Sequence, residues 1–428
     1  MPALHQSPAS APPSEPPGSA PTPAYVYDLA EVRRRHASLR SALPPSSVLY
    51  YSLKANPHPL LLDALREGGA RPEVCSTGEL SAALEAGWSG AEVLYTGPGR
   101  PDDEITRALE AGVRLFSVDS PHALDQLDRI ASAGDVAVDC LLRVNDDHPV
   151  PGQGLVMTGV PSQFGADASW ILDEPERFVS RDHARVVGLH LYMGSNVDGV
   201  DALTTQFERS LRTAGRLAGA LARHGVRLRL LDLGGGFGAP FATTGGASDL
   251  SGLDRRLDRL LGELLPAVVA PGDPLPEVAF ESGRYLVATA GTLFTRVLDV
   301  KISQGRNVVV LESGINHLGG MSGLRRLPPL RPTLVTDEDR GASETVPTIV
   351  TGPLCTPLDT WARAAELPPL RPGDLLSVPN VGAYGLTASL VAFLGRPMPC
   401  EVVIDSSAPG TAPAVSRLGL VRTAQGDR

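Results

Sequence analysis

The amino-acid sequence predicts an α/β protein, a (β/α)8 barrel followed by a mainly β domain. Strand-like and helix-like segments alternate between residues 48 and 284. Eight such strands over roughly 240 residues match the size of this barrel. After Arg284 the pattern changes to short β-like runs between Pro- and Gly-rich turns, with no long helical pattern. A doubly wound sheet, the alternative, would have fewer strands and a Gly-rich turn after the first one, which this chain lacks.

The barrel strands are expected at residues 48–56, 72–76, 92–97, 114–120, 136–145, 186–194, 228–236 and 278–284. Helices are expected between most of them, for example over 77–86 and, from apolar residues near helical spacing, over 202–224. The later β-like runs are 292–303, 307–312, 346–350, 375–378 and 401–404. The expected division is a disordered Pro/Ala/Ser-rich tail over 1–24, a barrel domain over 25–285 and a C-terminal β domain over 286–428.

The composition is typical of a soluble globular protein and argues against nucleic-acid and membrane partners. The formal net charge is -10, whereas nucleic-acid binding favours a basic stripe. There is no apolar run long enough to span a bilayer and no secretory signal pattern at the N-terminus. The four cysteines, at 75, 140, 355 and 400, form no Cys-x-x-Cys pair, so neither a disulfide framework nor a metal site is expected. Reduced thiols favour a cytoplasmic location.

Lysine is unusually scarce in this chain. Lys54 and Lys301 are its two lysines, and arginine supplies the other basic residues. A guanidinium group does not deprotonate near neutral pH, so arginine cannot replace an amine nucleophile. The lysines that remain are therefore candidates for chemistry that arginine cannot perform.

Lys54 stands in the segment Tyr-Ser-Leu-Lys-Ala-Asn-Pro at the end of the first predicted strand. The carboxyl ends of barrel strands open onto the face that carries the active site. A lysine there can form a Schiff base with an aldehyde cofactor. A solvated surface lysine is the alternative, which the scarcity of lysine and the strand-end position make weaker.

Two more motifs end the seventh and eighth predicted strands. Gly234, Gly235 and Gly236 let backbone N–H groups approach a phosphate group, although glycines also make tight turns. In the segment Glu281-Ser-Gly283-Arg284, the carboxylate could pair with a protonated pyridine nitrogen, and Gly283 and Arg284 could extend the phosphate site. An ordinary Glu–Arg ion pair is the alternative.

Three further segments carry candidate functional residues. His190 and Tyr192 alternate with leucines, so they share one face of the sixth strand, which would face the barrel lumen. For Tyr192, core packing is the alternative. Cys355 in the β domain could donate a proton, although a lone cysteine is more often a small buried hydrophobe. Tyr384, in a Gly-Ala-Tyr-Gly segment, suits a phosphate contact.

Taken together, from about residue 25 to 403, these motifs resemble the fold-type III pyridoxal-phosphate (PLP) decarboxylases, which include ornithine and diaminopimelate decarboxylases. The resemblance implies a PLP-binding barrel of the alanine-racemase type and a homodimer with shared active sites. It implies that Lys54 is the Schiff-base lysine, that Glu281 is the partner of the pyridine nitrogen, and that Arg143 lies near the cofactor. It implies that Cys355 reaches into the partner subunit's site and returns a proton to the substrate carbon. The phosphate-site positions that it implies are Ser195, Gly234, Gly235, Gly236, Gly283, Arg284 and Tyr384.

The sequence departs from the family pattern at three places. Tyr192 replaces the histidine that stacks on the cofactor ring, and Ser282 stands where the family usually has proline. Thr356 replaces the acidic residue that holds the distal ammonium of diamino substrates. Asp359 is another candidate substrate-binding residue. The segment 355–359 resembles a subgroup active in antibiotic and surface-polymer assembly more closely than it resembles the diamino-acid decarboxylases. Some members of that subgroup act on aminoacyl groups bound to a carrier protein.

The sequence thus predicts a PLP-dependent amino-acid α-decarboxylase whose substrate could be carried as a thioester on an acyl carrier protein. A basic patch of Arg325, Arg326 and Arg331 could meet such a carrier, although a solvated loop is the stronger interpretation on charge alone. Three alternatives remain: a decarboxylase of a free amino acid such as diaminopimelate or ornithine, an amino-acid racemase or epimerase, and a non-catalytic PLP-binding homologue. The spacing of Cys355 and Asp359 favours decarboxylation over racemisation, and retention of Lys54 with Cys355 argues against loss of catalysis.

Overall fold

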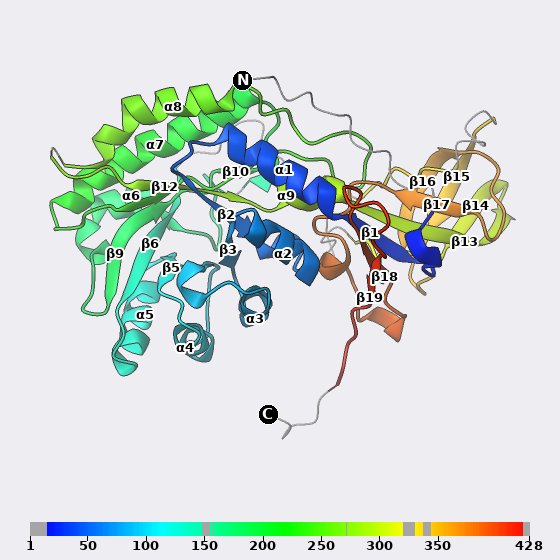
Figure 1. Ribbon diagram of the computed structural model, residues 1–428, viewed down its shortest axis with the longest axis horizontal. Helices are drawn as coiled ribbons and strands as arrows, with labels where there is room; N and C mark the ends of the chain where they lie inside the picture. The colour runs from blue at the N-terminus through cyan, green and yellow to red at the C-terminus, as the bar shows by residue number, and fades with distance from the viewer. Residues whose placement is uncertain are drawn as a thin grey trace. The chain divides into compact units, whose positions relative to one another are not determined.

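The computed structural model describes residues 15–147, 155–156, 158–270, 272–319, 330–336 and 344–422 (Figure 1). The chain forms two compact units. One unit comprises residues 33–239 and 247–286, and the other comprises 1–32, 240–246 and 287–428. Among the described residues, no helix has the length and apolar character needed to cross a membrane.

The first unit is the predicted barrel. Its eight strands are all parallel and follow one another in chain order around the barrel, and the pairing of the last strand, β12, with the first, β2, closes it. All eight predicted strands are confirmed, although most are shorter than expected. They are β2 (Val48–Ser52), β3 (Arg71–Val74), β4 (Leu94–Tyr95), β5 (Leu115–Val118), β6 (Val138–Asn145), β9 (Ala184–His190), β11 (Leu230–Asp232) and β12 (Glu277–Ser282).

Apolar side chains from most of the strands fill one end of the barrel lumen. This cluster comprises Val48, Tyr50, Leu94, Leu141, Val187, Leu230 and Ala279. A parallel barrel buries both faces of its strands, which explains the continuous apolar runs in the sequence. Glycine is required at position 188 of β9 because a Cβ atom there would lie 2.0 Å from the carbonyl oxygen of Leu230.

Helices cover the outside of the barrel. They are α1 (Leu29–Ala42), α2 (Pro59–Glu67), α3 (Thr77–Glu85), α4 (Asp102–Glu110), α5 (Pro121–Ala133), α6 (Ala168–Asp173), α7 (Val200–Ala222), α8 (Leu253–Leu264) and α9 (Arg284–Val287). The predicted helices over 77–86 and 202–224 are thus confirmed as α3 and α7. Serine side chains cap two of the helices: Ser76 accepts a hydrogen bond from the Glu79 N–H, and Ser120 accepts one from the Ala123 N–H.

Helix α7 is anchored to the barrel by aromatic packing. Phe207 lies edge-on to Phe280 of β12, with 5.3 Å between ring centroids, and 6.0 Å from Phe237. Such pairs contribute about 0.5–1.5 kcal/mol beyond the burial of apolar area. Since Phe280 directly precedes Glu281, this contact fixes the end of β12, where the candidate site begins.

The second unit contains a mainly antiparallel sheet in the order β16-β15-β14-β13-β1-β18-β19, with β17 paired to β13. Its strands are β1 (Ala24–Asp28), β13 (Gly291–Ser303), β14 (Arg306–Leu311), β15 (Val346–Thr351), β16 (Thr360–Leu367), β17 (Leu375–Val378), β18 (Cys400–Ile404) and β19 (Ala414–Ser416). Elsewhere, β7 (Leu155–Val156) pairs with β10 (Gly194–Ser195), and β8 (Ala166–Asp167) pairs with β6.

The two units divide the chain differently from the sequence-based expectation. Residues 25–32 and 240–246 belong to the β unit rather than to the barrel. For the first of these segments, the reason is that β1 pairs with β13 on one side and β18 on the other, so it lies inside the β sheet. Part of the segment expected to be a disordered tail is also described, including a 3-10 turn at Pro17–Ser19.

Candidate active site

Lys54 lies in a 3-10 turn, Leu53–Ala55, that follows β2 directly. Its Nζ donates hydrogen bonds to Oε1 and Oε2 of Glu73, at 3.0 and 3.1 Å. Glu73 ends β3 and also accepts a hydrogen bond from Oγ1 of Thr96, beyond β4. The Lys54 side chain is 45% exposed, whereas that of Glu73 is 2% exposed. A buried carboxylate therefore holds an accessible amine at the carboxyl ends of the barrel strands.

The glycine segment after β11 is packed too closely for any side chain. A Cβ atom on Gly234 would lie 2.9 Å from two atoms of Tyr192, and one on Gly235 would lie 2.0 Å from the carbonyl oxygen of Glu281. One on Gly236 would lie 2.7 Å from the carbonyl oxygen of Gly194. Gly234 and Gly236 also have φ values of +68° and +99°, which favour glycine. The N–H of Gly234 donates to Oδ1 of Asp232, so the N–H groups of Gly235 and Gly236 are the candidate donors to a phosphate group.

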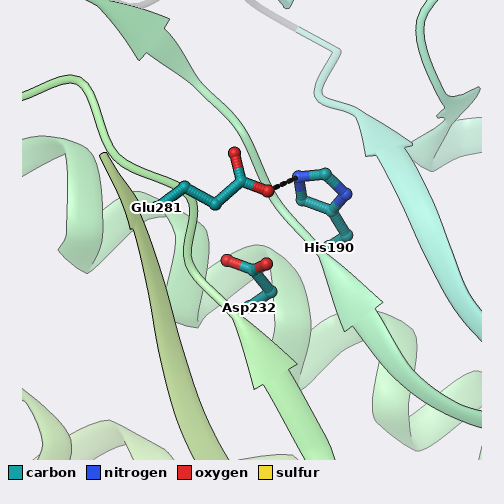
Figure 2. Close-up of side chains that lie close together, drawn as sticks. All are labelled: His190, Asp232 and Glu281. Carbon is teal, nitrogen blue, oxygen red and sulfur yellow. Dashed lines mark ion pairs between the residues drawn. The ribbon is translucent and has the colours of Figure 1, made fainter. Parts of the chain in front are cut away.

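His190, Asp232 and Glu281 form a buried cluster at the ends of β9, β11 and β12 (Figure 2). Nε2 of His190 lies 3.1 Å from Oε1 of Glu281 and forms an ion pair with it. On its other side, Nδ1 of His190 lies 2.9 Å from the Ser117 hydroxyl on β5. Asp232 accepts a hydrogen bond from the Gly234 N–H through Oδ1, whereas its Oδ2 has no hydrogen-bond partner among the described residues.

The pKa values in this cluster are strongly displaced. Burial raises the pKa of Asp232 to about 7, and the negative charge of Glu281 adds to this effect. Burial would also raise the pKa of Glu281, but the adjacent His190 outweighs it and lowers that pKa. Burial alone would lower the pKa of His190, yet the carboxylate of Glu281 raises it. Of the two carboxyl groups, Glu281 is therefore the ionised one, and the neighbouring His190 favours its own protonated form.

Arg143, Tyr192 and Ser195 lie near this cluster. Arg143 on β6 is paired in register with His190 and stacks on Phe164, with 4.7 Å between the guanidinium carbon and the ring centre. Tyr192 is half-buried beside Gly234, and Ser195 lies in β10. Arg143 thus lies beside His190 and Tyr192 beside Gly234, and the roles of Arg143, Tyr192 and Ser195 at a cofactor stay predictions.

Gly283 and Arg284 follow β12 at its junction with α9. A Cβ atom on Gly283 would lie 2.9 Å from that of Ala55 and 3.2 Å from that of Ser52. Glycine is therefore required here because the segment packs directly on the turn that carries Lys54. Ser282, the residue that departs from the family's proline, is buried in β12 and pairs in register with Tyr51.

In the β unit, Cys355 and Thr356 lie in the loop 352–359 between β15 and β16. Cys355 is exposed, and the Thr356 hydroxyl accepts a hydrogen bond from the Leu358 N–H at 3.3 Å. Asp359, expected to bind substrate, has a different set of contacts. It is 2% exposed, and its two oxygens accept hydrogen bonds from the N–H groups of Ile315 and Leu354, each at 2.8 Å.

Asp359 is enclosed by two glycines that leave room for its carboxylate. A Cβ atom on Gly314 would lie 2.1 Å from Oδ1 of Asp359, and one on Gly352 would lie 2.3 Å from Oδ2. Because both oxygens are engaged with the backbone, Asp359 fixes the ends of the loop that carries Cys355. Tyr384, also in the β unit, is half-buried and has a φ of +55°, a strained value for a non-glycine residue.

Several residues of the barrel site were not predicted from the sequence. Glu73 contacts Lys54, Ser117 contacts His190, and Asp232 belongs to the buried cluster. Thr96 in turn donates a hydrogen bond to Glu73. Asp232 had a signal, since an acidic residue between leucines at the end of an apolar strand is costly to bury without a function. Thr96 and Ser117 had none, because small hydroxyl residues are common at strand ends.

The barrel residues fit pyridoxal phosphate. An accessible amine, a closely packed glycine segment that admits no Cβ atom, and a buried ionised carboxylate match the aldehyde, the phosphate and the pyridine nitrogen of this cofactor. Among the described residues, Oε1 of Glu281 has an ion-pair contact with His190 and no aligned hydrogen bond.

Comparison with known proteins agrees with this geometry. Residues 29–288 match the family described as pyridoxal-dependent decarboxylase, pyridoxal binding domain. The chain is 32% identical over 388 residues to the L-glutamyl-[BtrI acyl-carrier protein] decarboxylase of Niallia circulans, covering 89% of this chain and 88% of the relative. It is also 32% identical over 399 residues to the diaminopimelate decarboxylase of Pseudomonas aeruginosa, covering 90% and 88%.

Two solved structures share the whole architecture. The diaminopimelate decarboxylase of Helicobacter pylori complexed with L-lysine has a TM-score of 0.78 at 25% identity, covering 93% of this chain and 94% of that one. The lysine decarboxylase of Selenomonas ruminantium in complex with PLP and cadaverine has a TM-score of 0.74 at 26% identity, covering 91% of each chain. The chain belongs to the pyridoxal-dependent decarboxylase family and is a PLP-dependent amino-acid decarboxylase.

Proposed function

We propose that Lys54 holds the aldehyde of PLP and that Glu281 faces the ring nitrogen. When bound, the cofactor supplies the electron sink for the electron pair left by the departing α-carboxylate. The phosphate group would be held by the glycine segment, Gly283 and Arg284, with Ser195 and Tyr384. Arg143 and Tyr192 would flank the cofactor, and Cys355 would return a proton to the α carbon. Asp359 would act as a positioning residue for the Cys355 loop rather than as a substrate contact.

For the substrate, we propose an acidic amino acid tethered as a thioester to an acyl carrier protein. The observation that carries this proposal is the loop 352–359, whose one carboxylate belongs to Asp359 and is fully engaged by two backbone N–H groups. Thr356 offers a hydroxyl only. A distal ammonium left without a charge partner in a desolvated site loses about 3 kcal/mol or more, roughly a hundredfold in affinity.

A neutral thioester carries no such penalty. The relative from Niallia circulans acts on an L-glutamyl group on an acyl-carrier protein, which supports the same class of substrate here. Of the three arginines considered for carrier contact, Arg325 and Arg326 lie outside the described residues, and Arg331 is exposed.

The test is carbon dioxide release from glutamyl- and aspartyl-carrier thioesters beside free glutamate, aspartate, ornithine, lysine and diaminopimelate. We expect efficient turnover of a carrier thioester and little of the diamino acids. The variant Thr356→Glu should raise turnover of a free diamino acid, whereas Thr360→Glu on β16 should not. Efficient turnover of a free diamino acid by the unmodified protein, with none of the tethered substrates, would sink the carrier proposal and leave the decarboxylase assignment intact.

We also propose a homodimer in which the partner's copy of Cys355 completes each site, and a cytoplasmic location. The exposed position of Cys355 on its loop supports the first proposal. All four cysteines are free, which supports a reducing compartment. Mixing inactive Lys54→Ala and Cys355→Ala proteins tests the shared site, since hybrid dimers would regain one intact site.

A further inference from the structure

The cluster in Figure 2 holds two carboxyl groups and one imidazole, all at the end of the barrel lumen. One ligand atom of each residue lies within 4.8 Å of the others, and the three residues are at most 2% exposed. Two ionised carboxylates this close in a buried site repel each other strongly. One imidazolium can balance one of them, so the charges of the cluster cancel only if the other carboxyl group keeps its proton.

The hydrogen bonds indicate which carboxyl group is ionised. Glu281 faces Nε2 of His190, and both Lys54 and Arg143 also favour its charged form. Asp232 has one backbone N–H donor, from Gly234, and its Oδ2 is buried without a hydrogen-bond partner among the described residues. Oε1 of Glu281 also lacks an aligned hydrogen bond, but it lies 3.1 Å from the imidazole of His190. A buried carboxylate without such a counter-charge costs more than a buried neutral acid.

The titratable groups that face Asp232 from the neighbouring strands also favour its neutral form. Besides Glu281 on β12 and His190 on β9, they are Glu73 on β3 and Tyr50 on β2. Glu73 adds negative potential, and Tyr50 is a buried phenol that is itself neutral. Among the described residues, His190 is the basic residue within ion-pair distance of Glu281, and its Nδ1 lies 2.9 Å from the Ser117 hydroxyl on β5.

We propose that Asp232 is a neutral carboxylic acid in the folded protein and that His190, fixed by Ser117, is a positioning residue whose imidazolium keeps Glu281 ionised. The inference rests on the proposed role of Glu281 and deepens it. Glu281 would then present a single negative charge to the ring nitrogen of PLP, and Asp232 would store a proton behind it without competing for His190.

The first test uses the cofactor-free protein, so it does not depend on turnover. The folded protein keeps the proton of Asp232 up to about pH 7, whereas an unfolded Asp releases it near pH 3.9. Between these pH values the folded state binds one proton more than the unfolded state, so the free energy of unfolding falls as pH rises. The unfolding constant of the unmodified protein, divided by that of Asp232→Asn, should rise roughly tenfold per pH unit from pH 5 to 7, then level off.

Urea unfolding followed by circular dichroism measures this ratio. Asp249→Asn is the matched control because the pKa of Asp249 is lowered by hydrogen bonds from Ser251. Its carboxylate is ionised throughout this pH range, so its ratio should stay level. A level ratio for Asp232→Asn as well, or one that falls with pH, would overturn the neutral assignment.

The second test measures the dissociation constant of PLP. Asp232→Asn should bind within about threefold of the unmodified protein, because an amide resembles a neutral acid in shape and charge. His190→Gln should bind at least tenfold more weakly, and Ser117→Ala should change in the same direction by less. His36→Gln, a buried histidine on α1, controls for the loss of any buried imidazole.

Equal weakening by Asp232→Asn and His190→Gln would show that Asp232 is a charged partner and would contradict the proposal. If His190→Gln fails to fold, Ser117→Ala with unchanged PLP affinity would contradict the role of His190. If the proposed role of Lys54 is wrong, the result is different: a borohydride-stable PLP adduct would still form in the Lys54→Ala variant.

Discussion

Nζ of Lys54 lies 3.0 Å from Oε1 and 3.1 Å from Oε2 of Glu73, so one carboxylate binds the amine through both of its oxygens. The lysine belongs to the turn after β2 and the glutamate to β3, which are adjacent parallel strands. The pairing of β2 with β3 therefore positions the amine while leaving it exposed. A reacting aldehyde can reach the nitrogen while the rest of the side chain stays in place.

Lys54→Ala should abolish attachment of the cofactor, because an alanine has no amine to condense with the aldehyde. Borohydride reduction followed by peptide mass spectrometry should find reduced PLP on Lys54 in the unmodified protein and nowhere in the variant. Lys301, in β13, is the internal control, since it is the second lysine of the chain. Reduced PLP on Lys301 would show that the assignment is wrong.

Glu73→Gln should slow cofactor capture about tenfold, because an amide keeps one acceptor but loses the charge-assisted contact. The rate of the absorbance change after adding PLP measures this effect. Glu277→Gln, an exposed residue on β12, should leave the rate unchanged. If both variants capture PLP at the normal rate, Glu73 does not position the amine.

Cys355→Ala should bind PLP nearly normally and yet lose turnover or release a misprotonated product. The proposed role of the thiol comes after cofactor binding, so the two properties should separate. Adding Lys54→Ala protein should restore part of the activity through hybrid dimers. An equal loss of cofactor affinity would make Cys355 structural, and no recovery despite demonstrated subunit exchange would contradict a shared site.

Asp359→Ala should destabilise the β unit by about 1–3 kcal/mol for each backbone N–H left without an acceptor. The thermal midpoint measures this loss, and Asp299→Asn, an exposed residue on β13, controls for removal of a carboxylate. Binding of PLP should change much less than turnover. A normal midpoint with a large rise in KM would restore Asp359 as a substrate contact.

Stability should fall on acidification through His58. Burial lowers the pKa of His58 to about 4, whereas an unfolded histidine titrates near 6.5. Between these values the unfolded state binds the extra proton, so the contribution of His58 to the free energy of unfolding falls by roughly 1.4 kcal/mol per pH unit as pH decreases. Asp232 contributes a slope of opposite sign, so the measurement is a ratio. The unfolding constant of the unmodified protein in urea, divided by that of His58→Gln, should rise roughly tenfold per pH unit as pH falls from about 6 to about 4.5; a level ratio would exclude His58.

The barrel and most of the β strands could be predicted because their residues agree locally with the final structure. β16 was missed, since its Ala, Arg and Glu residues favour helix, and pairing with β15 overrides that preference. β1 was missed as a strand because both of its partners lie far along the chain.

The site residues also differ in how far they could be predicted, depending on whether their contacts are local in the chain or between distant segments. Motif spacing located Lys54, the glycine segment and Glu281, each at a strand end. Spacing could not show that Glu73 holds Lys54 or that His190 links Ser117 to Glu281, because these contacts join different strands. For Asp359, the sequence could not distinguish a carboxylate facing substrate from one enclosed by Gly314 and Gly352.

The position of β1 has a consequence for synthesis. This strand ends at Asp28, whereas its neighbours begin at Gly291 and Cys400, so the barrel is made in between. At ~5–20 residues per second, β1 waits on the order of 10 to 50 s for its first partner to leave the ribosome. Apart from the pairing of β2 with β12, neighbouring barrel strands follow one another in the chain, so most of them can pair as they emerge. The sheet that contains β1 can be completed only after the barrel has been synthesised.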